Sequence, residues 1–189
     1  VREVRLLQKD IAIASYQDGS VHRLDFSKQT KTPLCTPQPG GPVAIAVSSR
    51  RGQVVVQRTR PEIVLLYAAG KELDVQPTGS TSERVEIRFS NRGSDVAVAY
   101  KSGLINLYSI DDRSTAKLVA RASVEMPTER RTANVRAMCF RSDDAQLAVG
   151  WDDGTVCLLN LSNRQWNTSE FAFDDSPVSL TYFEDELIA

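Results

Sequence analysis

Four segments of this chain repeat one pattern: a short apolar strand, a tight turn and a second apolar strand. The segments are residues 11–21, 54–63, 96–105 and 147–156. Three of them superpose on the turn glycines Gly19, Gly103 and Gly154. The superposition aligns an aromatic residue at the end of each first strand (Tyr16, Tyr100 and Trp151) and an aliphatic residue on each second strand (Val21, Ile105 and Val156). A register shared at three positions indicates a true internal repeat.

Further strands on both sides of each hairpin complete the repeat unit. An alternating apolar strand precedes the hairpins, at residues 43–47, 85–89, 135–140 and 178–183, and a weaker strand follows them, as at residues 117–120 and 170–173. Turns rich in Ser, Asn, Asp and Gly separate these strands, and such residues favour turns because their side chains bond nearby backbone. Units of four short strands that recur about every forty residues are typical of β-propeller blades.

We therefore predict an all-β fold, a β-propeller built from four-stranded antiparallel blades. The blade boundaries are expected near residues 1–42, 43–84, 85–134 and 135–177, with the start of a fifth blade at 178–189. About four and a half blades do not close a ring, and an open array leaves strand edges free to pair with other chains. We expect this chain to be a segment of a larger propeller, or a partial ring that a second polypeptide completes.

The turn sequences resemble those of the WD-repeat family of propellers. The closest copies of the family's Asp-Gly turn and following strand are Asp18–Asp25 and Asp153–Asn160. Leucine or tyrosine stands where the family has tryptophan, and only Asp25 keeps the acidic residue that follows it. No Gly-His dipeptide occurs in the chain, so the family's buried His-Asp network is not expected. The resemblance implies a degenerate WD-repeat β-propeller.

Composition limits the class of protein. Of the 189 residues, 41% are hydrophobic, enough for a substantial core. No apolar run approaches the roughly twenty residues that cross a bilayer, and no secretory signal is visible. The three cysteines are an odd number without metal-ligand spacing. Buried thiols favour a reducing compartment, so we expect an intracellular, cytoplasmic protein, including a ciliary or endomembrane-associated assembly.

The sequence offers little catalytic chemistry. His22 is the only histidine, and it lies on a predicted strand. The pairs Asp111-Asp112 and Asp152-Asp153 occupy turn positions, where carboxylates usually form turns. Gly40-Gly41 lies among prolines and lacks the Lys-Ser or Lys-Thr of a phosphate loop. We predict a non-enzymatic domain with no cofactor, metal or small-molecule substrate. An enzyme would require His22 and the Asp152-Asp153 turn to converge in a pocket.

A weak charge asymmetry distinguishes the two rims expected of the disc. The turns that join first to second and third to fourth strands are mildly basic and include Arg50 and Arg51. Phosphoinositide-binding propellers carry Phe-Arg-Arg-Gly at a blade junction, but here Ser49 precedes the arginines and the triplet falls within a blade. With a net charge of −1, strong nucleic-acid binding is not expected. A nucleic-acid or phosphoinositide reader using the basic rim remains the alternative, and Arg50 and Arg51 are its weak candidates.

The leading prediction is a non-catalytic protein-protein interaction scaffold within a multisubunit complex, such as a coat, transport or ciliary assembly. Its partners would be other subunits, steered by charge. The candidate contact residues lie on the opposite, acidic rim: Arg58 and Arg60 in the second hairpin, Arg130 and Arg131 in a loop at residues 125–134 that should protrude, and Asp152 and Asp153 in the fourth hairpin. Pro61 in the second hairpin lacks a backbone donor, so its turn should be wider or less regular than the others.

Overall fold

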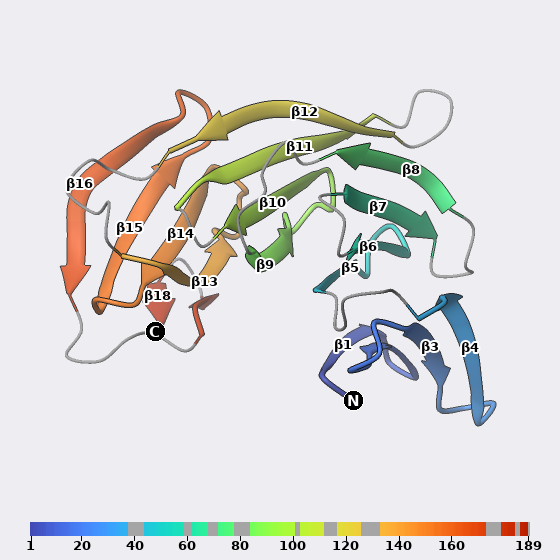
Figure 1. Cartoon of the computed structure of the whole chain (residues 1–189). Coiled ribbons are helices and arrows are strands. Elements are labelled where there is room, and N and C mark those ends of the chain that lie inside the picture. Colours follow the sequence, from blue (N-terminus) through green and yellow to red (C-terminus); the bar gives the residue numbers. More distant parts are fainter. Residues whose placement is uncertain are drawn as a thin grey trace. The chain divides into compact units, whose positions relative to one another are not determined.

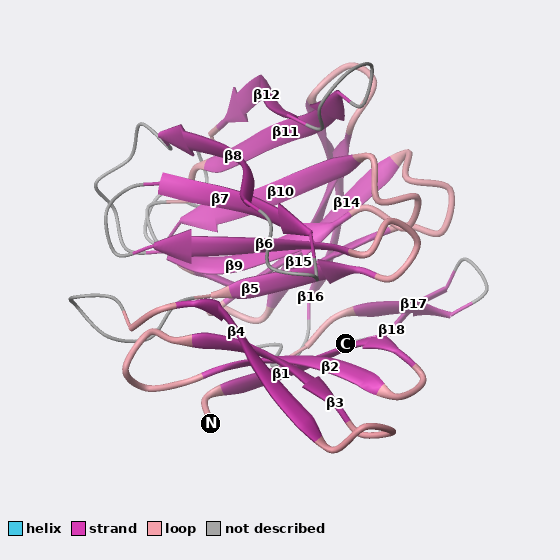
Figure 2. Ribbon diagram, turned by 90° about the vertical axis from the view of Figure 1, so that its right-hand side faces the viewer, coloured by secondary structure: helices cyan, strands magenta, loops and turns pink. Residues whose placement is uncertain are grey.

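Strands form every regular element that the computed structural model describes (Figures 1 and 2). The described residues are 1–37, 44–58, 62–67, 72–77, 84–100, 103–111, 117–125, 133–172, 179–183 and 186–188. They contain no helix that is long and apolar enough to cross a membrane. The prediction of an all-β chain is confirmed.

The strands form four four-stranded sheets, each built from consecutive strands and called a blade below. Blade 1 contains β1 (Glu3–Gln8), β2 (Ile11–Ser15), β3 (Val21–Asp25) and β4 (Thr30–Cys35). Blade 2 contains β5 (Ile45–Ser48), β6 (Gln53–Arg58), β7 (Glu62–Tyr67) and β8 (Glu72–Pro77). Blade 3 contains β9 (Arg84–Phe89), β10 (Asp95–Tyr100), β11 (Ile105–Asp111) and β12 (Lys117–Val124). Blade 4 contains β13 (Val135–Phe140), β14 (Gln146–Trp151), β15 (Thr155–Asn160) and β16 (Gln165–Ala172). A two-stranded sheet follows, made of β17 (Thr181–Phe183) and β18 (Glu186–Ile188).

The chain divides into two compact units, residues 1–81 with 109–119 and residues 82–108 with 120–189. In the first unit, the core brings together apolar residues of blades 1 and 2. Its buried members are Leu7, Ile13, Val21, Cys35, Ile45, Val54 and Val56. Since the second strand of a blade is covered on both faces, Ala12, Ile13 and Ala14 are all fully buried.

The core of the second unit is larger and joins blades 3 and 4. Trp151 is fully buried in it and packs against Trp166, with ring centroids 6.0 Å apart. Met138 and Leu147 are also fully buried there. A separate apolar cluster connects blade 4 to Leu180 and the half-buried Tyr182.

The aligned aromatic residues do not all share one environment. Tyr100 and Trp151 are fully buried, as the repeat predicts, but Tyr16 is only half-buried. Tyr16 makes an edge contact with His22, and the Lys31 ammonium lies 4.2 Å from its ring centroid. A cation over an aromatic face keeps one side of the ring near water, which accounts for its partial exposure. The aliphatic partners Val21, Ile105 and Val156 are all fully buried.

The repeated turns follow the sequence pattern closely. Gly19, Gly103 and Gly154 all have positive φ, between 79° and 85°, which glycine adopts at little cost. In blade 1, Asp18 accepts hydrogen bonds from the backbone and hydroxyl of Ser20, and in blade 4, Asp153 accepts the same pair from Thr155.

In the second hairpin, strands β6 and β7 pair as far as Arg58 and Glu62. In blade 1 the backbone N of Tyr16 donates to the carbonyl of Ser20, which also leaves three residues in the turn. Residues 59–61 of the second hairpin, Pro61 among them, lie outside the described part of the chain, so the wider or less regular turn stays a prediction.

Candidate functional site

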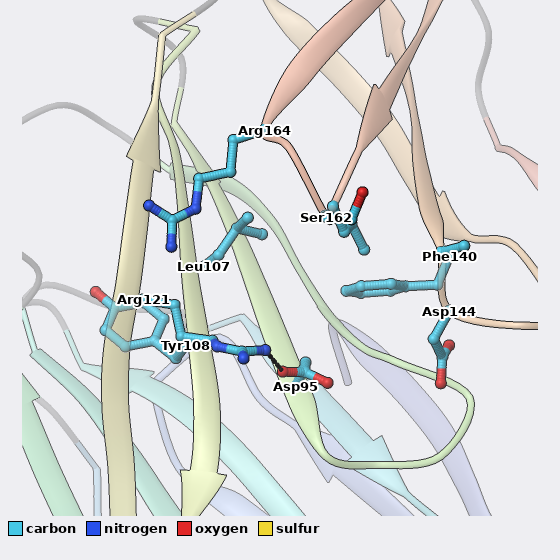
Figure 3. Close-up of a pocket in the computed structure, with 10 residues that line it drawn as sticks. Asp95, Leu107, Tyr108, Arg121, Phe140, Asp144, Ser162 and Arg164 are labelled. Carbon is cyan, nitrogen blue, oxygen red and sulfur yellow. Dashed lines mark hydrogen bonds and ion pairs between the residues drawn. The ribbon is translucent and has the colours of Figure 1, made fainter.

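A groove of about 350 Å³ lies in the second unit and is lined by blades 3 and 4 (Figure 3). Blade 3 contributes residues of β10, β11 and β12, and blade 4 contributes the end of β13 and the turns before β14 and after β15. Its volume falls near the lower end of the usual range for ligand pockets, about 300–1,000 Å³.

The floor of the groove is apolar and is part of the packed core of the second unit. Leu107 and Phe140 are 8% and 6% exposed and belong to the core of the second unit, against which the half-buried Leu161 also packs. The Tyr108 hydroxyl accepts a long hydrogen bond, 3.5 Å, from the Asn106 side chain. Burial raises the pKa of Tyr108 to about 12, so this phenol stays neutral at physiological pH. Leu107, Tyr108 and Phe140 lie on strands, and a ligand would therefore meet a preformed surface.

An ion pair crosses the sheet at one side of the groove. Arg121 on β12 donates to the Asp95 carboxylate on β10 at 3.1 Å, and the Ser94 hydroxyl donates to the same carboxylate at 2.6 Å. The Arg121 side chain is 59% exposed. Because a guanidinium has five N–H donors, Arg121 keeps donors that can face a ligand.

Asp144 forms a second polar edge and joins the two blades. Its carboxylate accepts hydrogen bonds from the backbone N of Asn91 at 2.7 Å and of Arg92 at 2.9 Å, and from the Asn91 side-chain amide at 3.0 Å. Asp144 has φ 61°, and Gly93 occupies the matching turn position of blade 3 with φ 72°. The left-handed conformation costs a non-glycine residue roughly 1–2 kcal/mol. The bonds to blade 3 offset that cost.

Arg164 projects from the turn between β15 and β16. Figure 3 shows its side chain extending toward β11 and β12, where Leu107 and Arg121 lie. Its φ is 60°, and Gln29 has φ 53° at the same position of blade 1. In both blades a residue four positions earlier holds the turn: Asn160 accepts bonds from the backbone and hydroxyl of Ser162, and Asp25 accepts bonds from the Ser27 hydroxyl and the Lys28 backbone.

The arginine side chain has no ion-pair or hydrogen-bond partner among the described residues. The turn that carries Arg164 is thus ordered by its own hydrogen bonds, while the guanidinium stays available.

A second cavity of about 230 Å³ lies in the same unit, beside β9, β13 and β17. Cys139 and Tyr182 line it, and burial raises the pKa of each to about 12. A thiol that stays protonated is a poor nucleophile and a poor metal ligand. Cys139 is therefore a weak candidate for a nucleophile or a metal ligand.

The predicted site residues Asp152 and Asp153 both serve the fourth hairpin. Asp152 accepts bonds from the side-chain amide of Asn134 at 2.6 Å and from its backbone N at 2.8 Å. These bonds, the side-chain one above all, lower the pKa of Asp152. Asp153 closes the turn through Thr155. Neither residue lines either cavity described above.

The other candidates are spread over several elements. Arg60, Arg130 and Arg131 lie outside the described residues, and Arg58 ends strand β6. Arg50 is exposed and Arg51 half-buried in the turn before β6. Neither Arg50 nor Arg51 lines the groove.

His22, the one histidine, is half-buried on β3. Burial, followed by the nearby charge of Lys31, lowers its pKa. No group of His, Cys, Asp and Glu that could hold a metal occurs in the described part of the chain.

The residues of the groove were not predicted as a site. The sequence places Asp144 and Arg164 each on its own blade and says nothing of what faces it across the blade junction. A signal was nevertheless present. Asp144 stands where the preceding blade has glycine, and a non-glycine residue at such a position indicates a compensating contact.

No protein-family model matches this sequence, and no curated protein matches it. Solved structures do match. KlHsv2 with loop 6CD replaced by a Gly-Ser linker superposes with a TM-score of 0.76 at 14% identity, over 97% of this chain and 59% of that one. The β-propeller domain of Myceliophteria thermophila Cps50 (Swd1) superposes with a TM-score of 0.75 at 14% identity, over 97% and 59%.

The chain thus spans 59% of the length of each of these two structures. At 14% identity the likeness establishes the fold alone. Together with the blades described above, it shows that this chain has a β-propeller fold.

Proposed function

We propose that this chain is a non-catalytic protein-interaction scaffold of a multisubunit intracellular assembly, and that a partner protein docks in the groove between blades 3 and 4. The proposal includes the WD-repeat-like character that the turn sequences indicate. The observation that carries it is the combination of an apolar floor with two exposed arginines on a rigid frame. Loops and strand ends on such frames are common sites of binding.

The groove has the composition of an interaction site. Aromatic residues and arginine are enriched in the centres of protein interfaces, where they contribute much of the binding energy. Here Phe140 and Leu107 give an apolar centre, and Arg121 and Arg164 stand beside it. Tyr108, with its raised pKa, adds a neutral aromatic ring.

The charge of the neighbouring turns argues against the alternative of a nucleic-acid or phosphoinositide reader. Arg141 forms an ion pair with Asp143 in the turn before β14. Asp144 and Asp95 add carboxylates within the groove itself. Affinity for a polyphosphate depends on several uncompensated cations, and this part of the surface alternates in sign.

The test is site-specific photocross-linking in cells of the source organism. The full chain would carry p-benzoylphenylalanine at Ser162, which lines the groove, or at the exposed Thr32 of β4 as a matched control. We expect one reproducible protein adduct from position 162, lost when Arg164→Glu is added, and none of that mass from position 32. Adducts from position 32 alone would place the interaction surface elsewhere and refute the assignment of the groove.

A further inference from the structure

We propose that the occupant of this groove is an acidic peptide segment carrying an apolar anchor, with its carboxylates on Arg164 and Arg121 and its anchor against Leu107, Phe140 and Leu161. The inference rests on the proposed function and specifies the chemistry of the partner. Charge complementarity carries it. The carboxylates of Asp95 and Asp144 already accept hydrogen bonds from the protein, whereas the guanidinium of Arg164 has no partner among the described residues.

The two carboxylates of the groove are both engaged. Asp95 receives Arg121 and the Ser94 hydroxyl. Asp144 receives two backbone amides and one side-chain amide of blade 3. Amide donors partly neutralise a carboxylate, as at a helix N-cap. These anions therefore hold the frame of the groove together and have little capacity left for a cationic ligand.

The two arginines of the groove balance its two aspartates in formal charge, but their N–H donors are not all used. Arg164 has no acidic partner among the described residues, and Arg121 uses one nitrogen, Nη1, for Asp95. A guanidinium matches a carboxylate through two parallel N–H···O bonds, which gives orientation as well as affinity. A ligand that brings one or two carboxylates would accept hydrogen bonds from these remaining donors.

The backbone turn that carries Arg164 is ordered before a ligand arrives. Asn160 accepts three hydrogen bonds in this turn, from the backbone and hydroxyl of Ser162 and the backbone of Asn163. Asn163 in turn accepts from the backbone N of Gln165 at 3.1 Å. A preorganised turn loses less conformational entropy on binding than a mobile one.

The apolar floor explains why the ligand needs an anchor. Leu107 and Phe140 are nearly buried already, so the accessible floor is a shallow patch on a packed core. A phenylalanine or leucine side chain laid on it would remove apolar surface from water. Desolvating this patch also strengthens the adjacent arginine-carboxylate bonds.

Fluorescence anisotropy with four labelled hexapeptides tests the inference on the full chain. The probes are Ser-Asp-Glu-Phe-Asp-Ser, the same peptide with Phe replaced by Ser, the same with every acid replaced by its amide, and the same with every acid replaced by Lys. We expect only the first to bind measurably. Arg164→Glu should weaken it at least about tenfold, since the substitution removes charge-assisted hydrogen bonds and places a like charge beside the acids of the peptide. Arg164→Lys should retain part of the affinity.

Arg2→Glu is the matched control, because Arg2 is exposed in blade 1 and its one described bond comes from its backbone. It should leave binding unchanged, and melting curves should show that both variants fold. Equal binding of the acidic peptides with and without Phe would refute the anchor. Insensitivity to Arg164→Glu would refute the arginine contact, and no binding of any probe would overturn the inference as a whole. The cross-linking experiment at position 162 is independent of these probes, so a persistent adduct there would preserve the proposed function while this inference fails.

Discussion

The Glu86 carboxylate on β9 accepts a hydrogen bond from the backbone N of Met138 on β13, at 2.7 Å, and so joins the first strands of two successive blades. Glu3 does the same for Ile45 in the first unit, with a longer distance of 3.4 Å. In the repeat register Glu3 matches Glu86, and Ile45 matches Met138. Each glutamate is paired with an arginine two residues later, Arg5 or Arg88. Arg88 also donates to the Met138 carbonyl at 3.1 Å.

Glu86→Gln should therefore lower the free energy of unfolding by about 1–2 kcal/mol, because the amide keeps the shape of the side chain but weakens a charge-assisted hydrogen bond. Urea denaturation followed by tryptophan fluorescence measures this change. Glu125→Gln is the control, at an exposed residue for which surface substitutions usually change stability by less than about 0.5 kcal/mol. Equal stabilities of the two variants would show that the bond to Met138 contributes nothing.

Trp151→Ala should cost roughly 3–5 kcal/mol, the usual range for a buried large aromatic residue. Trp151 is fully buried in the core of the second unit. Its indole nitrogen is buried without a hydrogen-bond partner among the described residues, so Trp151→Phe should cost clearly less than Trp151→Ala. Chemical denaturation of both variants checks the order. A loss below about 1 kcal/mol for Trp151→Ala would contradict the packing described above.

The repeat was readable from the sequence because turn chemistry and strand alternation are local. Gly19 and Gly154 marked the hairpin turns, and Asp18 and Asp153, directly before them, close the same turns. The environment of Tyr16 could not be read in the same way, since it depends on Lys31, which reaches its ring from another strand.

The sequence pattern also did not predict the contacts between blades. Equivalent positions of the repeat hold Glu3-Val4-Arg5 and Glu86-Ile87-Arg88, and this similarity is visible in the sequence. The backbone amide that donates to each glutamate, however, belongs to the next blade. The groove depends on such contacts as well. Only the structure shows that Arg164 of blade 4 extends toward Leu107 of blade 3.

Asp152→Asn should reduce the sensitivity of the fold to acid. The hydrogen bonds from Asn134 lower the pKa of the folded carboxyl, so its stabilising contribution is fully present above the unfolded pKa and is lost as pH falls through the lower folded value. Between about pH 5 and pH 2 the variant should therefore lose less stability than the native chain. Urea midpoints across that range give the slope, and Asp10→Asn in an exposed turn serves as the control. Identical slopes for native chain and Asp152→Asn would refute the role of this carboxylate.

Deleting residues 127–132 should leave the melting temperature nearly unchanged while weakening association with a partner. Both ends of this connection are anchored independently of its middle: the Trp166 indole donates to the Glu125 carbonyl at 2.8 Å, and Asp152 holds the backbone of Asn134. The connection also carries the candidate contacts Arg130 and Arg131, whose charges can pair with an acidic surface and are screened by salt. Calorimetry and the cross-linking yield from position 162 measure the two effects. Unfolding on deletion would show that the segment is needed for stability. An unchanged cross-linking yield with an unchanged melting temperature would show that the segment does not contribute to association and that the groove alone binds the partner.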